Sequence, residues 1–206
     1  MSHEPHMVSL GFTDQTFPAG VHMCQIFGGD EERLDALLKF VSSGLEAGER
    51  VACFTEKLDQ ARLANHLTDH GLACDKLMES GALSRAGTSE VYFQDDRFDP
   101  DRMLGLLRQF HSDSVAAGFP AARVIGEMTA EVQHISGGSR LMEYESRVSL
   151  LLKDVPITAV CQYDANVFDG ATIMQVLKVH PMMLIRGVVV HNPFFVPAEE
   201  FLAHHC

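Results

Sequence analysis

The sequence predicts a three-layer α/β domain with a mainly parallel sheet and helices on both faces. Three observations predict this fold. Short apolar runs alternate along the chain with stretches whose apolar residues recur at helical spacing. The short runs are almost continuously apolar, as expected for parallel strands that are buried on both faces. The 206 residues are 46% hydrophobic and 21% charged, which suits one globular domain with a sizeable core.

The first strand–helix unit shows the pattern most clearly. A buried strand is predicted at 21–27, and Asp30 is expected to cap the helix that follows. The carboxylates of Glu31 and Glu32 suit the positive end of that helix. Its buried stripe is predicted to comprise Leu34, Leu37, Leu38, Val41 and Leu45.

Similar units follow along the rest of the chain. Asp99 and Asp169 are placed to begin helices, and Pro181 ends the last of them. The remaining predicted elements are a strand at 50–55, a helix at 57–70, a short helical turn within 72–82, a strand at 90–93, a helix from 99 to 118, a strand at 123–128, a helix beginning after Ser139, a strand at 157–163, a helix at 169–179, and a strand or hairpin at 182–190. Residues 1–19 are expected to form a flexible lead-in, 20–196 the domain, and 197–206 a C-terminal tail.

The first strand–helix turn lacks a phosphate-binding loop. Such a loop needs spaced glycines, free backbone N–H groups, and a Lys followed by Ser or Thr. Here Gly28 and Gly29 lead into three carboxylates at 30–32, which would repel a phosphate. The sequence therefore favours a nucleotide-binding scaffold that has lost its usual chemistry, and binding rather than catalysis.

Composition excludes several other classes. The net charge is −12 and no cluster of Lys and Arg is present, which opposes direct binding of nucleic acid. No apolar run reaches membrane-spanning length, and the polar N-terminus does not resemble a secretory signal. The cysteines are odd in number and none forms a CxxC motif, so we expect free thiols in a reducing cytoplasm. They are Cys24, Cys53, Cys74, Cys161 and Cys206.

Ligands of parallel sheets usually bind outside the carboxyl ends of the strands, which directs attention to the residues there. Side chains alternate between the two faces of a strand, so His22 and Cys24 share one face of the first strand, and Cys161 and Tyr163 share one face of the fifth. Each also has a structural explanation, because buried Cys, core His and packed Tyr are common. Glu127 at the end of the fourth strand is harder to explain in this way, because a buried carboxylate needs a partner.

The residues then reveal a resemblance. The segments 22–27, 31–32, 44–50, 123–128, 144–145, 161–164, 180–181 and 192–193 resemble, in order, those of the MEDS domain, named for methanogens, methylotrophs and a dichloromethane-responsive regulator. The likeness covers about residues 20–195. It implies a RecA/KaiC-like fold without a working ATP site, and a sensory module that binds small hydrocarbon derivatives in prokaryotic signalling. It also implies a ligand pocket formed by His22, Cys24, Glu127, Tyr144, Glu145, Cys161, Tyr163 and His180.

The expected function is therefore a non-catalytic sensory domain that binds a small organic ligand without a cofactor. Its output is expected to pass through a separate signalling protein, and a homodimer is expected on base rates. The alternative is a metal- or cysteine-dependent enzyme that uses His22, Cys24, Glu127, Cys161 and His180. A metal set of His22, Cys24, Cys161 and His180 is a weaker signal, because its spacing is dispersed. A pure interaction module is the third alternative.

Overall fold

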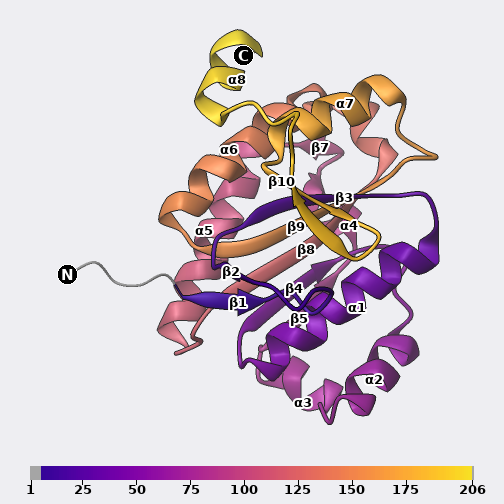
Figure 1. Ribbon diagram of the computed structural model, residues 1–206, viewed down its shortest axis with the longest axis vertical. Helices are drawn as coiled ribbons and strands as arrows, with labels where there is room; N and C mark the ends of the chain where they lie inside the picture. The colour runs from indigo at the N-terminus through magenta and orange to yellow at the C-terminus, as the bar shows by residue number, and fades with distance from the viewer. Residues whose placement is uncertain (1–5, 206) are drawn as a thin grey trace.

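A seven-stranded sheet forms the centre of the protein in the computed structural model, which describes residues 6–205 (Figure 1). The strand order is β11-β10-β3-β9-β8-β4-β5, and every neighbouring pair is parallel except β10 and β11. The strands are β3 (His22–Phe27), β4 (Arg50–Phe54), β5 (Leu83–Ala86), β8 (Ala122–Met128), β9 (Ile157–Asp164), β10 (Met182–Ile185) and β11 (Val188–His191). The predicted mainly parallel sheet is confirmed, and 182–190 belongs to a hairpin.

Helices cover both faces of this sheet, which gives the predicted three layers (Figure 1). One face packs against α1 (Asp30–Glu46), α2 (Gln60–Asp69) and α3 (Cys74–Glu79). The other packs against α4 (Thr88–Tyr92), α5 (Pro100–Ala116), α6 (Leu141–Asp154) and α7 (Gly170–Val179). Two 3-10 turns, Ala130–Gln133 and Gly138–Arg140, connect β8 to α6. We call these faces the α1 face and the α6 face.

The α1 helix forms where the sequence predicts it, because one stripe of apolar residues packs against the sheet. All five residues of its predicted stripe are buried against the sheet. The helix begins differently, however, because Gly29 is its N-cap and makes no side-chain cap bond. Asp30 instead accepts a hydrogen bond from Nε of Arg33 at 2.8 Å. By contrast, Asp99 and Asp169 do cap α5 and α7 through their carboxylates.

The predicted third strand at 90–93 is wrong. Most of that segment is the short helix α4, which Glu90 stabilises by accepting a hydrogen bond from the N–H of Gly87 at 3.1 Å. The edge strand of the sheet is instead β5, where only Leu83 is fully buried. An edge strand with so few buried positions has no continuous apolar run, which is why the sequence does not reveal it.

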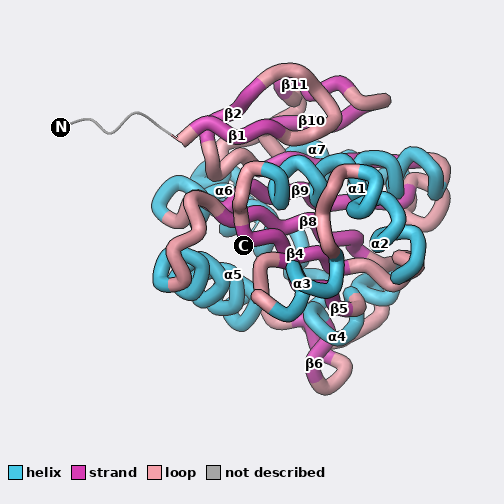
Figure 2. Tube along the Cα trace, turned by 90° about the horizontal axis from the view of Figure 1, so that it is seen from below, coloured by secondary structure: helices cyan, strands magenta, loops and turns pink. Residues whose placement is uncertain are grey.

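Described residues near both ends of the chain form regular structure that the sequence does not predict. Strands β1 (Met7–Ser9) and β2 (Thr16–Pro18) pair antiparallel, and Val8 and Leu10 enter the core of the α1 face. The segment expected to be a tail forms α8 (Ala198–His205), which packs against α6. Residues 1–5 and Cys206 lie outside the described residues. A hairpin of β6 (Phe93–Gln94) and β7 (Arg97–Phe98) lies on the opposite side of the molecule from β11 (Figure 2).

None of the helices in residues 6–205 combines the length and apolar character needed to cross a membrane.

Candidate functional site

Seven of the eight residues that the sequence selects lie together on the α6 face of the sheet. Alternation along β3 and β9 brings Cys24 beside Cys161 in register. Helix α6 packs over these strands and supplies a tyrosine and a glutamate, and the residue that follows α7 completes the group. The seven are His22, Cys24, Tyr144, Glu145, Cys161, Tyr163 and His180.

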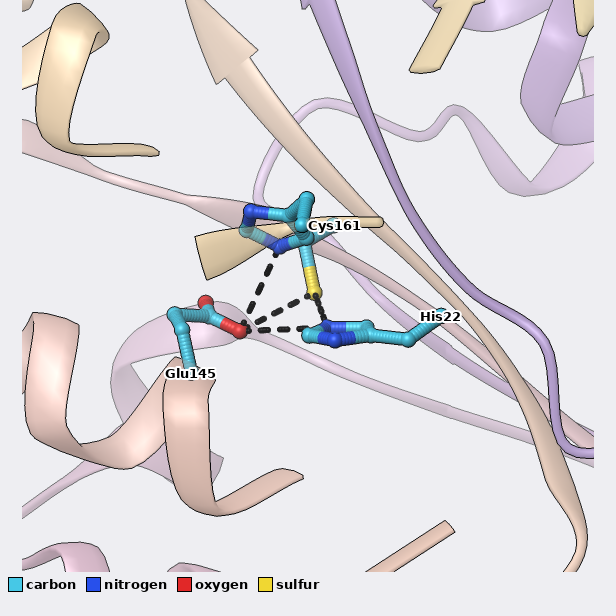
Figure 3. A group of neighbouring side chains, drawn as sticks. His22, Glu145 and Cys161 are labelled. Carbon is cyan, nitrogen blue, oxygen red and sulfur yellow. Dashed lines mark hydrogen bonds and ion pairs between the residues drawn. The ribbon is translucent and has the colours of Figure 1, made fainter. Parts of the chain in front are cut away.

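Four of these side chains form a tight group, which we call the central cluster: His22, Glu145, Cys161 and His180. One potential ligand atom from each lies within 4.8 Å of the other three. Oε2 of Glu145 lies 3.3 Å from Nε2 of His22, 3.5 Å from Nε2 of His180 and 3.5 Å from Sγ of Cys161. Figure 3 shows the carboxylate of Glu145 pointing between the imidazole of His22 and the thiol of Cys161.

Hydrogen bonds behind the cluster fix how the two imidazoles are protonated. Nδ1 of His180 lies 2.8 Å from the carbonyl oxygen of Val176, which can only accept, so Nδ1 carries the proton. The hydroxyl of Ser149 donates to the carbonyl of Val179 and therefore accepts from Nδ1 of His22, at 2.8 Å. In neutral imidazoles with this tautomer, both Nε2 atoms present lone pairs to the cluster.

The other oxygen of Glu145 is also held in place. Oε1 accepts a hydrogen bond from the hydroxyl of Tyr163 at 2.5 Å. Oε2 faces both imidazoles. Burial alone would raise the pKa of Glu145, but the contacts with His180 and His22 lower it. Nε2 of His180 is buried and makes no hydrogen bond. Four polar side chains therefore converge at one buried point, where Nε2 of His180 has no hydrogen-bond partner among the described residues.

Burial tunes the ionisable groups of this face. Burial, and after it the nearby imidazole of His180, lower the pKa of His22 to about 4. Burial and then the charge of Glu145 raise the pKa of Cys24 to about 12 and raise the pKa of Cys161 as well. At neutral pH His22 is therefore an uncharged imidazole and both cysteines are thiols.

A tyrosine that the sequence analysis did not select joins the cluster to an apolar cavity. The hydroxyls of Tyr92 and Tyr144 hydrogen-bond each other. Gly126, the residue paired with Cys161 on β8, makes room for Tyr92, because an added Cβ would lie 2.7 Å from its hydroxyl. The ring of Tyr92 packs edge-on against Phe54.

Phe54 also lines the cavity, which has a volume of about 320 Å³ and lies between α5 and strands β4, β5 and β8. Its other lining residues are mostly apolar and include Ala52, Met103, Leu107, Phe110 and Val124. The cavity is on the same face of the sheet as the central cluster.

The expectation that Glu127 shares this site is not met. Because side chains alternate along β8, Glu127 points to the α1 face. There Arg33, which is fully buried, lies 3.5 Å from it, and Thr55 donates a hydrogen bond to it at 2.7 Å. The same guanidinium donates to the hydroxyl of Thr55 and to the carbonyl of Lys57. Residues of the chain itself thus satisfy Glu127: Arg33, Thr55 and also Lys57, whose Nζ lies 3.6 Å from it.

The central cluster also departs from the expected position at the carboxyl ends of the strands. His22 begins β3, and Cys161 lies in the middle of β9. The cluster therefore lies on the α6 face of the sheet, between the strands and α6, and not at the carboxyl ends of the strands. The carboxyl ends instead border a second cavity of about 270 Å³. Its lining carries one lysine, Lys57, and four carboxylates, Glu56, Glu127, Glu131 and Asp164. This acidic lining opposes phosphate binding, as the missing phosphate loop predicts.

Comparison with solved structures assigns the fold class. The chain is similar to a KaiC-like protein from Pyrococcus horikoshii, with a TM-score of 0.58 and 14% identity over 87% of this chain and 80% of that one. It is also similar to the flagellar accessory protein FlaH from Methanocaldococcus jannaschii, with a TM-score of 0.62 and 12% identity over 90% of this chain and 84% of that one. The protein is therefore a RecA/KaiC-like α/β domain.

The family follows from the sequence comparison. Residues 21–181 match the methanogen/methylotroph, DcmR sensory domain, and the chain belongs to this MEDS family. It is 24% identical over 160 residues to the transcriptional repressor DcmR of Methylorubrum extorquens. The match covers 77% of this chain but only 57% of that repressor. The family assigns the chain a sensory role in regulation.

Proposed function

We propose that this sensory domain binds a small organic molecule on the α6 face and does not transform it. A hydrocarbon-derived compound with one polar end is the chemical class that fits best. The observation that carries the proposal is the convergence of four polar side chains, the central cluster, at a buried point where Nε2 of His180 makes no hydrogen bond. Buried polar atoms without partners are costly, so a group that supplies donors or positive charge is favoured there.

The apolar cavity supports an organic ligand. Its volume of about 320 Å³ lies at the lower end of the range for small-molecule pockets. Covering apolar ligand surface here would contribute about 25 cal/mol per Å². Tyr92 lies between this cavity and the residues next to Cys161, so it can couple the apolar and polar parts of one site.

The pKa values of the thiols argue against a cysteine-dependent enzyme. A nucleophilic cysteine needs a lowered pKa, usually beside a cationic partner. Here burial raises the pKa of Cys24 to about 12 and also raises that of Cys161. Both groups are poor nucleophiles in this environment, which supports a binding role.

Sensing also requires an output, which we propose passes to a separate signalling protein. Two of the polar groups, Glu145 and His180, come from α6 and the end of α7, which cover the sheet. A ligand that binds one arrangement of these helices more tightly than another would shift their populations. A homodimer remains our proposal for the assembly, and light scattering during gel filtration tests it.

A thermal-shift screen of one-carbon and short-chain compounds at millimolar concentration tests ligand binding. At least one compound should raise the melting temperature of the wild-type protein. The increase should be lost in Glu145→Gln and kept in the control Glu127→Gln, whose carboxylate is on the opposite face. Stabilisation that depends on Glu127 and not on Glu145 contradicts the proposal, as does a screen in which no compound stabilises the protein.

ATP provides a separate check. The acidic carboxyl-end cavity and the buried Arg33 predict no binding of ATP with Mg²⁺ at micromolar concentrations. Calorimetric titration measures this directly, and micromolar affinity would overturn the interpretation of the nucleotide position.

A further inference from the structure

We propose that the central cluster is a metal site in which Nε2 of His22, Nε2 of His180, Sγ of Cys161 and Oε2 of Glu145 bind one divalent ion of the zinc type. Imidazole nitrogen, thiolate sulfur and carboxylate oxygen are the donors that zinc takes in proteins. The set replaces Cys24 of the sequence-based alternative with Glu145, which the sequence did not connect to metal binding.

The spacing of the ligand atoms fits tetrahedral coordination. Bonds of about 2.0–2.3 Å to a tetrahedral ion place the ligand atoms about 3.3–3.8 Å from one another. Three distances from Oε2 of Glu145 are 3.3, 3.5 and 3.5 Å, to His22, His180 and Cys161. Sγ of Cys161 also lies 3.5 Å from Nε2 of His22. The remaining pairs lie within 4.8 Å, so only a small movement of His180 completes the tetrahedron.

The hydrogen bonds around the cluster prepare each ligand for a cation. The carbonyl of Val176 and the hydroxyl of Ser149 hold the protons of the imidazoles on Nδ1, away from the cluster. Tyr163 binds the oxygen of Glu145 that does not face the imidazoles. In known metal sites, hydrogen-bond partners of this kind orient the ligands. The unsatisfied Nε2 of His180 is an independent sign that a partner belongs there.

A metal here would link four segments that are distant in the sequence. His22 comes from β3, Glu145 from α6, Cys161 from β9 and His180 from the end of α7. A metal ion that binds the folded protein but not the unfolded chain would therefore hold α6 and α7 against the sheet and stabilise the fold. This inference rests on the proposed function for its role in sensing, but metal binding itself depends only on the geometry.

Metal content is the first test. Protein prepared without an affinity tag, in a His204→Ala, His205→Ala background that removes the terminal histidines, is incubated with zinc and desalted. Elemental analysis should find about one zinc per chain, and zinc should raise the melting temperature. Less than about 0.1 equivalents of zinc would overturn the proposal.

Cobalt identifies the ligands. Co²⁺ should give the intense visible bands of a tetrahedral site and a thiolate-to-cobalt charge-transfer band. Cys161→Ser should abolish the charge-transfer band, and Cys24→Ser, which alters the neighbouring thiol on the same face, should retain it. The reverse result would refute the assignment of Cys161.

Variants of residues that hold the ligands in place, but do not themselves contact the ion, provide a test if the ligand variants fold poorly. Ser149→Ala and Tyr163→Phe should keep the fold, as judged by circular dichroism, and should weaken zinc affinity by about 10–100-fold. Unchanged affinity in both would contradict the site as drawn.

Repeating the compound screen with and without a chelator separates the two proposals. Metal binding without stabilisation by any compound refutes the ligand proposal alone. Stabilisation by a compound in protein that binds no zinc refutes the metal proposal alone.

Discussion

Two buried polar groups occupy opposite faces of the same sheet, and they differ in whether the chain satisfies them. On the α1 face, the guanidinium of Arg33 supplies donors to Asp30, Thr55 and the carbonyl of Lys57 and lies 3.5 Å from Glu127. On the α6 face, the central cluster leaves Nε2 of His180 buried without a hydrogen bond. The first group is complete without any partner, and the second is not.

The difference distinguishes a structural polar group from the proposed binding site. Glu127 lies at the carboxyl end of a central strand, where nucleotide-binding α/β folds commonly bind their ligand. In this chain an internal arginine takes that position. The unsatisfied group lies elsewhere, under α6, where the fold class alone would not direct attention. We infer that the ligand site has moved from the rim of the sheet to its face.

The largest effect is expected from removing the internal cation. Arg33→Met should lower the free energy of unfolding by about 3–5 kcal/mol, because it removes the buried ion-pair partner of Glu127 and leaves only the exposed Lys57, 3.6 Å away. Urea unfolding measures the change. The control Arg62→Met removes an exposed arginine that pairs with Glu31, and it should have little effect. Similar stabilities for the two variants would break the comparison.

Matched carboxylate variants should differ in how much they destabilise the protein when it is freed of metal. Glu127→Gln should destabilise the fold by about 1–3 kcal/mol, because it weakens an ion pair that the structure satisfies. Glu145→Gln should cost less, about 1 kcal/mol or below, because the lost charge, whose pKa the contacts with His180 and His22 lower, is offset by an amide that can donate to an imidazole while its oxygen still accepts from Tyr163. Urea unfolding of both variants in a chelator tests this, and equal destabilisation would count against it.

The packing next to Cys161 should be sensitive to one methyl group. Gly126→Ala should cost about 1–3 kcal/mol, because the new Cβ lies 2.7 Å from the hydroxyl of Tyr92. Combining it with Tyr92→Phe should recover part of the loss. Gly105→Ala, in helix α5 with nothing within 4 Å, is the control and should stabilise by up to about 1 kcal/mol. A similar cost at both glycines would show that the contact with Tyr92 is not what matters.

Thiol reactivity should show the smallest effect. Burial raises the pKa of both Cys24 and Cys53 to about 12, so only about one thiol in ten thousand is ionised at pH 8. Alkylation of the native protein, followed by peptide mass mapping, should leave both unmodified until the protein is unfolded. Rapid labelling of either thiol in the native state would mean that this part of the core opens readily.

Local patterns predicted the elements that are buried on a regular period. The stripe of α1, the continuous runs of β3, β8 and β9, and the aspartates that cap α5 and α7 were all found in this way. Local patterns do not predict β5, which is an edge strand with one fully buried position. They also predict a strand in place of α4, because its apolar residues follow one another as in a strand. The packing of the chain ends, through Leu10 and Phe201, also depends on distant residues that no local pattern reveals.

The sequence by itself determined the fold class, the family and the absence of a phosphate loop, because these depend on periodicity and on motifs that are contiguous in the chain. It also selected most residues of the site. Only the tertiary structure decided which of them meet. The register of β3, β8 and β9 sets which side chains share a face of the sheet. Glu127 therefore lies beside Arg33 on one face, and Glu145 contacts His22, Cys161 and His180 on the other. Residues up to 158 positions apart in number, from 22 to 180, become neighbours only when the sheet and α6 pack together.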